Sequence, residues 1–167
     1  MDNRQALYNT GRGCNKCTLC RSRHNVVNGD GDLNAEIVLV STSPGFEEDE
    51  IGKPMVGPSG RLLNSMLEKA GIDRKKVWVT NVVRCLPREG RTIREPNPEE
   101  IEACSEFIDA ELAALPMKKI IIPLGNVALK YITNTKTGAI TSKRGHEEKS
   151  EKYSCWVLPT FHPRAVA

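Results

Sequence analysis

The chain has 167 residues, of which 39% are hydrophobic and 27% are charged, a composition that excludes disordered, collagen-like and coiled-coil proteins. This length suffices for one buried core and is too short for two ordinary domains, so we expect a single domain over 1–167. No apolar run reaches the roughly 18 residues of a membrane span, and the N-terminus lacks a signal-peptide core, so we expect a soluble, cytoplasmic protein. The net charge of +3 permits nucleic-acid binding without requiring it.

The first half of the chain predicts an irregular lobe, a strand and a helix. Residues 1–34 are polar and carry three cysteines within seven positions. The apolar run 37–40 is followed by Ser-Thr-Ser-Pro-Gly, which is typical of a buried parallel strand that ends in a loop. After a long loop, apolar residues recur at helical spacing from Pro58 to Gly71.

The second half of the chain also alternates between predicted strands and a helix. Buried strands are predicted at 77–83, 120–124 and 155–158, and a helix at 98–115 with Ile101, Cys104, Ile108 and Leu112 on one face. Strands that alternate with helices indicate an α/β domain with a mostly parallel sheet. Functional side chains should then gather at the carboxyl ends of the strands.

Six cysteines in a reducing compartment favour metal binding over disulfides. Cys14 and Cys17 form a C-x2-C pair, and Cys85 and Cys104 lie beside predicted elements. Four thiolates suit either zinc or a [4Fe–4S] cluster, and their spacing does not choose between them. Cys104 alternatively serves as a small buried residue, Cys20 competes for the ligand role, and Cys155 is expected in the core.

Four motifs occur in order: the C-x2-C lobe, PGFEED at 44–49 with GKPMVGPSGRLL at 52–63, TNVVRC at 80–85 and PTFHP at 159–163. Together they resemble the iron–sulfur (family 4) uracil-DNA glycosylases and the related domain of phage-type DNA polymerases, over about residues 11–166. The resemblance implies a three-layer α/β sandwich with an N-terminal iron–sulfur lobe. It also implies a [4Fe–4S] cluster on Cys14, Cys17, Cys85 and Cys104, with Cys20 not a ligand. Relatives continue into a further helix, so we expect a fragment or one module of a longer protein.

Two polar residues match the chemistry of uracil removal. Asn81 follows a buried strand, and its amide offers the donor and acceptor that uracil O4 and N3–H require; without the resemblance, a turn cap is an equal alternative. His162 in Thr-x-His-Pro would donate to uracil O2 as the base leaves as an anion, the alternative being a structural histidine. Ser43, Gly45 and Glu48 are also expected to contact the base.

Two positions depart from the family. Thr42 stands where the family's Gly-Glu-x-Pro-Gly motif carries the glutamate that positions or deprotonates water, and a hydroxyl holds water without acting as a base near neutral pH. Met55 replaces the aromatic residue that stacks on the base, which gives a softer apolar surface. Glu47, Glu48 and Asp49 either recruit water or form a solvated loop.

Arginines after the second strand are the predicted DNA contacts. Four of them follow within eleven positions, in a segment that Pro87 and Gly90 mark as a loop: Arg84, Arg88, Arg91 and Arg94. Lys143, Arg144 and His146 are expected to extend this surface, and a solvated loop is the alternative. Arg164 and Ala165 occupy the place where relatives insert a wedge into the duplex.

The sequence therefore predicts a uracil-DNA glycosylase that hydrolyses the N-glycosidic bond in base-excision repair. Its expected partner is uracil-containing DNA, with no membrane, and a monomer is expected unless the chain is part of a larger replication or repair protein. The alternative function is a catalytically weak or inactive iron–sulfur DNA-binding module of a phage-type replication polypeptide.

Overall fold

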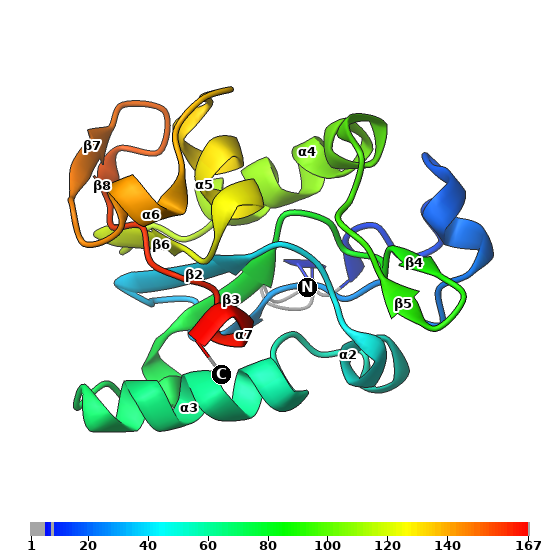
Figure 1. Ribbon diagram of the computed structural model, residues 1–167, viewed down its shortest axis with the longest axis horizontal. Helices are drawn as coiled ribbons and strands as arrows, with labels where there is room; N and C mark the ends of the chain where they lie inside the picture. The colour runs from blue at the N-terminus through cyan, green and yellow to red at the C-terminus, as the bar shows by residue number, and fades with distance from the viewer. Residues whose placement is uncertain (1–5, 8, 167) are drawn as a thin grey trace.

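The computed structural model describes residues 6–7 and 9–166 and is built on a six-stranded sheet of order β1-β3-β2-β6-β8-β7 (Figure 1). The strands are β1 (Asp30–Gly31), β2 (Ile37–Ser41), β3 (Trp78–Asn81), β6 (Ile120–Pro123), β7 (Glu148–Ser150) and β8 (Cys155–Val157). The four central strands are parallel, whereas β1 and β7 pair antiparallel at the two edges. The predicted mostly parallel sheet is confirmed, and the two edge strands are additions to it.

Helices cover both faces of the sheet (Figure 1). The helical segments are η1 (Thr18–Arg21), α2 (Phe46–Ile51), α3 (Pro58–Lys69), η2 (Arg74–Lys76), α4 (Pro98–Ala113), α5 (Asn126–Thr133), α6 (Ile140–Lys143) and α7 (Pro163–Val166). Helix α3 lies on one face, and α4 and α5 lie on the other. The three-layer α/β sandwich is thus confirmed, with α3 and α4 close to their predicted bounds. Within the described residues, no helix is long and apolar enough to cross a membrane.

Each strand contributes to two cores because successive side chains point to opposite faces. On β3, Trp78 packs in the core shared with Ile108 of α4, whereas Val79 packs in the core shared with Leu63 of α3. The predicted apolar face of α4 is confirmed at Ile108 and at Leu112, which are both fully buried.

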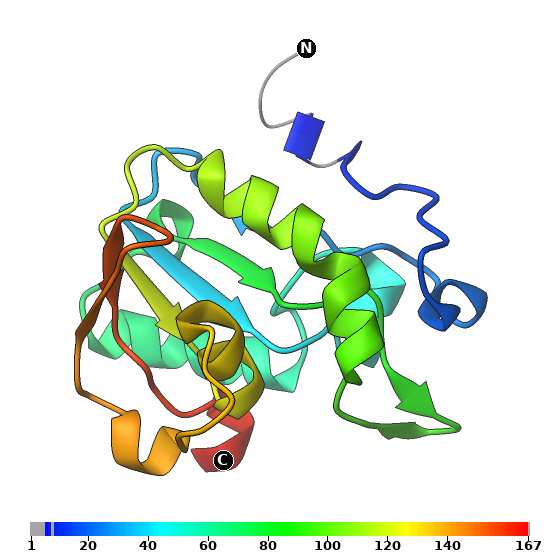
Figure 2. The same ribbon diagram turned by 90° about the horizontal axis from the view of Figure 1, so that it is seen from above.

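The strand register brings the carboxyl ends of the parallel strands to one edge. Ser41 is level with Asn81, and a bridge joins Leu124 to Thr160. Figure 2 shows β2, β3 and β6 pointing toward the edge where α6, α7 and the β4–β5 hairpin lie.

Two segments predicted as loops contain regular structure. Helix α2 forms within the long loop because the Glu48 carboxylate accepts a hydrogen bond from the backbone N–H of Gly45 at its start, and Gly52 ends it with a left-handed φ of +81°. The arginine-rich segment forms a hairpin of β4 (Arg88–Glu89) and β5 (Thr92–Ile93), and Gly90 supplies the positive φ of its turn.

Candidate active site

A cleft of about 1010 Å³ opens at the carboxyl edge of the parallel strands. Its wall begins with Thr42–Glu48 after β2 and includes Leu124–Val127 after β6. The cleft brings together eight of the residues predicted from sequence: Thr42, Ser43, Gly45, Glu48, Met55, Arg94, His162 and Arg164. These eight residues therefore lie together at this edge of the sheet.

Glu48 holds the wall of the cleft together. Its side chain is buried, and its carboxylate accepts hydrogen bonds from the backbone N–H groups of Gly45 (3.1 Å), Val56 (3.1 Å) and Gly57 (2.8 Å). These bonds join the start of α2 to the start of α3. The solvated-loop alternative is therefore wrong for Glu48, although it describes Glu47, which is exposed and pairs with Arg61.

Asp49 connects the same helix to the cysteine-rich lobe. The residue is 2% exposed, and its carboxylate accepts from the backbone N–H groups of His24 and Asn25 and lies 3.0 Å from the His24 Nδ1 atom. The Asn25 side chain donates in return to the Asp49 carbonyl at 2.7 Å. Asp49 is therefore a structural link, and the solvated-loop alternative is wrong for it too.

Met55 has a backbone that its neighbours fix in an uncommon conformation. Its φ is +52°, in the left-handed region. A Cβ atom on Gly60 would lie 1.8 Å from the Met55 carbonyl oxygen, so only glycine allows this close approach in the first turn of α3. Met55 lines the cleft and is 6% exposed, which places a thioether on the cleft wall.

His162 has one defined tautomer. The backbone N–H of Arg164 donates to Nδ1 at 3.1 Å, so the ring proton resides on Nε2, which lies 2.9 Å from Ser41 Oγ and donates to it. Burial lowers the pKa of His162 below its usual 6.5, and the charge of Arg164 lowers it further. The ring is therefore neutral at pH 7 and presents an N–H donor in the cleft.

Asn81 ends β3 and is 2% exposed. It is not among the residues that line the cleft, but it is level with Ser41, the hydrogen-bond partner of His162. Its side-chain oxygen is buried and has no hydrogen-bond partner among the described residues. An unsatisfied buried acceptor costs about 1–3 kcal/mol, and this oxygen remains available to an N–H donor of a ligand.

The four predicted ligand cysteines lie in one region. Burial raises the pKa of the Cys85 thiol to about 12, and charges on Cys104 and Cys17 raise it further. The pKa of Cys104 is likewise raised by burial and by charges on Cys17 and Cys14. No three ligand-type side chains in the described part of the chain converge on one ion position. Cys155 is buried in the sheet core, as predicted.

Arg84 is not a DNA contact, and that prediction is wrong. The residue is 1% exposed, and its guanidinium lies 2.8 Å from Glu111 Oε2 and donates to Asn28 at 2.8 Å. Glu111 also accepts from the indole N–H of Trp78 and the backbone N–H of Gly29. The segment after β3 that carries Cys85 is thereby fixed to α4.

The other predicted DNA contacts lie near the cleft. Arg88 and Arg91 are exposed on the hairpin, and Arg164 lines the cleft at the start of α7. Arg94 also lines the cleft, but both of its terminal nitrogens bond the buried Glu100 carboxylate, at 2.9 and 2.6 Å.

Sequence reasoning missed Ser41 and Glu100. Ser41 ends β2, and its hydroxyl orients the ring of His162, which follows β8. The two residues are 121 positions apart, so no short sequence motif reveals their contact. Glu100 had a signal, because Asn97 and Glu100 form an N-cap pair at the start of α4.

The sequence of the chain is similar to those of known proteins. Residues 28–167 match the family described as the uracil DNA glycosylase superfamily. A type-4 uracil-DNA glycosylase of Thermotoga maritima is 40% identical over 90% of this chain and 76% of the relative. A type-4 enzyme of Sulfurisphaera tokodaii is 38% identical over 99% of this chain and 76% of the relative. A DNA polymerase of Bacillus phage SP01 is 35% identical over 83% of this chain, which corresponds to 14% of the polymerase.

Proposed function

Because the chain belongs to the uracil-DNA glycosylase superfamily, in which it is similar to type-4 enzymes, we propose that it removes uracil from DNA. The reaction adds water across the N-glycosidic bond and yields free uracil and an abasic site. The observation that carries the proposal is the neutral His162 ring, whose Nε2–H is held in a cleft at the strand ends.

His162 stabilises the leaving group. As the bond breaks, negative charge develops on uracil O2, and the Nε2–H donor that now bonds Ser41 would bond that oxygen. The Arg164 N–H on Nδ1 keeps this tautomer in place. A neutral donor is suited to this task because it stabilises the anion without first having to lose or gain a proton.

Asn81 recognises the base. Its unpartnered side-chain oxygen would accept from uracil N3–H, and its amide nitrogen would donate to O4. Met55, Ser43 and Gly45 line the wall against which the extruded base would rest. Glu48 supports that wall through its three backbone bonds.

Thr42 holds the attacking water. It is half-buried, follows β2 and lines the cleft, so its hydroxyl can position a water molecule but cannot remove its proton near neutral pH. General-base catalysis contributes about 10²–10⁴-fold in typical enzymes. We therefore expect excision that is slow but measurable.

The DNA strand approaches along the edge of the sheet that carries the cleft. Arg88 and Arg91 on the hairpin and Arg164 on α7 would neutralise phosphates there, and Arg94 would add its charge from the position that Glu100 fixes. We take residues 1–167 as one unit, monomeric, without a membrane partner and with the cytoplasm as its compartment.

Cys14, Cys17, Cys85 and Cys104 would hold a [4Fe–4S] cluster. Four cysteine thiols are the donor set that such a cluster needs, one for each iron, so they need not converge on one ion position. They interact electrostatically and come from the lobe, the segment after β3 and α4. When bound, the cluster would supply bonds that tie these segments together. Cys20 is proposed to remain outside this set.

The second candidate function is a DNA-binding module with little or no catalysis. It is favoured by the departures at Thr42 and Met55 and by the similarity to a short part of a phage DNA polymerase. Both functions predict DNA binding, and only the first predicts base removal.

The deciding experiment measures alkali-labile breaks in uracil-containing oligonucleotides under single-turnover conditions. We expect breaks at uracil with the native chain, none with His162→Ala, and weakened recognition with Asn81→Asp, because that change replaces an amide donor by an acceptor. If neither the native chain nor the Thr42→Glu variant forms breaks while both bind DNA, the glycosylase function is rejected and the DNA-binding module remains.

A further inference from the structure

One cationic side chain of the cysteine-rich lobe bonds a cysteine instead of a carboxylate. The Arg23 guanidinium donates from Nη1 to the Cys85 sulfur atom at 3.7 Å, and its charge acts on the same sulfur. Among the described residues, no carboxylate lies within ion-pair distance of Arg23, whereas Lys16 of the same lobe pairs with Glu106. The charge of Arg23 is therefore directed at a sulfur atom.

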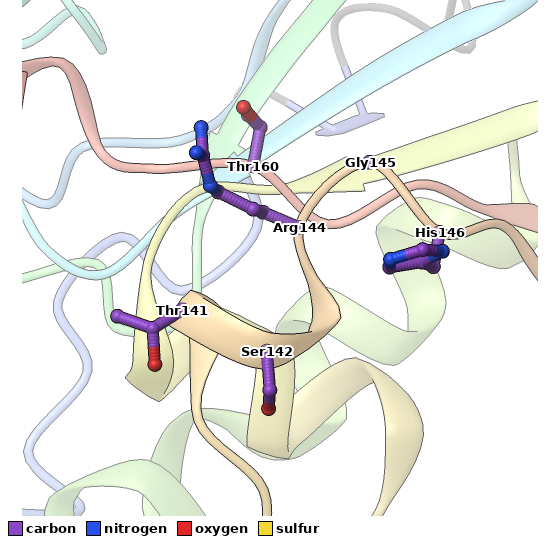
Figure 3. Close-up of a pocket in the computed structure, with 6 residues that line it drawn as sticks. All are labelled: Thr141, Ser142, Arg144, Gly145, His146 and Thr160. Atoms are coloured by element: carbon purple, nitrogen blue, oxygen red, sulfur yellow. The ribbon is translucent and has the colours of Figure 1, made fainter.

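Arg144 provides a contrast. Its guanidinium likewise has no carboxylate partner in the described part of the chain, but it stacks over the Phe161 ring, 4.6 Å from the ring centre. Figure 3 shows it beside Thr160 in an open hollow of about 400 Å³. Arg144 is exposed on the predicted DNA surface, whereas Arg23 is partly buried and bonds a cysteine that is 5% exposed.

The backbone at Arg23 is held from two directions. Its N–H donates to the carbonyl of the buried Leu19 at 3.1 Å, which closes the turn at the end of η1. The next residue, His24, donates its backbone N–H to the Asp49 carboxylate of α2 at 3.0 Å. Only the side chain of Arg23 must therefore be ordered for it to bond Cys85.

A second guanidinium near the proposed ligands is already neutralised. Arg84 donates its backbone N–H to the Cys104 sulfur, but its guanidinium lies 2.8 Å from the Glu111 carboxylate. The net charge of this pair is zero. Arg23 therefore supplies a positive charge beside the ligand sulfurs that no carboxylate offsets.

Cys85 is one of the four proposed cluster ligands, and a charge beside it acts on the cluster. A cluster on four thiolates is negatively charged and becomes more negative when it gains an electron. Hydrogen bonds to its sulfur atoms and the charges around it set its reduction potential. An arginine stays protonated, so it attracts the more negative, reduced state more strongly.

We propose that Arg23 raises the reduction potential of the cluster through its bond to Cys85 and so opposes oxidation of the cluster. Arg23 is a positioning residue in this role, because it acts through a ligand. This inference rests on the cluster proposed above and does not depend on uracil excision.

The first test compares two variants that each remove one positive charge from the lobe. Arg23→Gln removes the charge beside Cys85 and keeps an N–H donor, whereas Arg21→Gln removes a charge from an exposed position of η1. The potential of the cluster-loaded proteins is measured by voltammetry. Arg23→Gln should shift the one-electron equilibrium about tenfold toward the oxidised state, a fall of about 59 mV, and Arg21→Gln should match the native chain.

A second variant makes the charge switchable within one protein. The imidazole of Arg23→His is charged at about pH 5.5 and neutral at about pH 8. Between these values, the potential of Arg23→His should fall by more than that of the native chain. This comparison decides the question if Arg23→Gln does not retain its cluster.

Oxidation gives an independent readout. Ferricyanide takes one electron from the cluster, and its Fe(III) is reduced to Fe(II). At equal ferricyanide concentration, Arg23→Gln should lose the visible absorbance of the cluster several-fold faster than the native chain and Arg21→Gln. Equal rates in the three proteins would contradict a protective role.

Iron analysis separates this inference from the proposals beneath it. A native chain without about four irons would overturn both the cluster and the role of Arg23. If the loaded Arg23→Gln and Arg21→Gln variants shift the potential equally, or if Arg23→His follows the native pH profile, the role of Arg23 alone is overturned. A native chain that holds the cluster but excises no uracil would reject the glycosylase and leave these potentials valid.

Discussion

Replacing Glu48 should loosen the cleft by a predictable amount. In Glu48→Ala, the N–H groups of Gly45, Val56 and Gly57 lose their acceptor, and the carboxylate that binds them is only 7% exposed. Each buried donor left unsatisfied costs about 1–3 kcal/mol. Gly45 and Val56 are only partly buried, so we take the lower value for each of the three donors and expect a loss of about 3 kcal/mol in the free energy of unfolding.

Two further variants serve as comparisons, and both should lose less stability than Glu48→Ala. Glu48→Gln keeps the side-chain volume and one acceptor oxygen for the N–H groups of Val56 and Gly57. It places an amide nitrogen against the Gly45 N–H, which loses its acceptor, so we expect the free energy of unfolding to fall by about 1–3 kcal/mol. Glu47→Ala removes only an exposed pair with Arg61, 3.2 Å long, and should change stability by less than about 0.5 kcal/mol.

Urea unfolding followed by circular dichroism measures these differences, and single-turnover excision reports the cleft. We expect stability and excision rate to fall together in the order Glu47→Ala, Glu48→Gln, Glu48→Ala. If Glu48→Ala were as stable as Glu47→Ala, the three backbone bonds would not be what holds the wall, and the reasoning would fail.

Four further outcomes are expected. Thr42→Glu should raise the single-turnover excision rate about 10²-fold, or about 2.7 kcal/mol of barrier, because it adds a general base; an unchanged rate would remove position 42 from water activation. Excision should be constant near neutral pH and fall only below the lowered pKa of the folded His162 ring, which lies under its usual 6.5; a rate that falls already above pH 6.5 would contradict this. Stability should begin to fall at about pH 6.5, where His162 of the unfolded chain takes up a proton, and stop falling below the pKa of the folded ring; a stability profile unchanged by His162→Ala would contradict this account. Cys104→Ala should lose iron and folded structure together while Cys20→Ala keeps about four irons per chain by metal analysis, and equal loss in both would refute the ligand set. Arg84→Met should destabilise the fold by about 3–5 kcal/mol because Glu111 stays buried without its cation, and a loss under 1 kcal/mol in urea unfolding would count against that account.

The sheet and its two long helices were predictable because hydrophobic period and length identify them directly. The runs 37–40 and 120–124 are apolar on both faces, as parallel strands are. The edge strands β1 and β7 have two and three residues and no apolar pattern. Helix α2 was hidden because its sequence, FEEDEI, lacks an apolar stripe and depends on the capping Glu48.

The site was predictable where short motifs carry the chemistry and hidden where function depends on distant pairing. Thr42, Met55 and His162 follow strand ends or lie beside a helix start, so their motifs placed them in the cleft. Arg84 appeared to belong to an arginine-rich loop, but its acidic partner on α4 buries it. Its charge pattern alone could not reveal that partner.

The attachments of the cysteine-rich lobe have a kinetic consequence. Residues 24–29 bond partners that follow them by 25 positions at Asp49, 56 at Arg84 and 82 at Glu111. Closing such long loops costs conformational entropy that local contacts do not offset, so the lobe docks late, onto a sheet and an α4 that have already formed. During synthesis, Cys14 and Cys17 leave the ribosome well before Glu111 and must wait as free thiols until their docking surface exists. The order of translation is therefore the reverse of the order in which this part of the molecule can assemble.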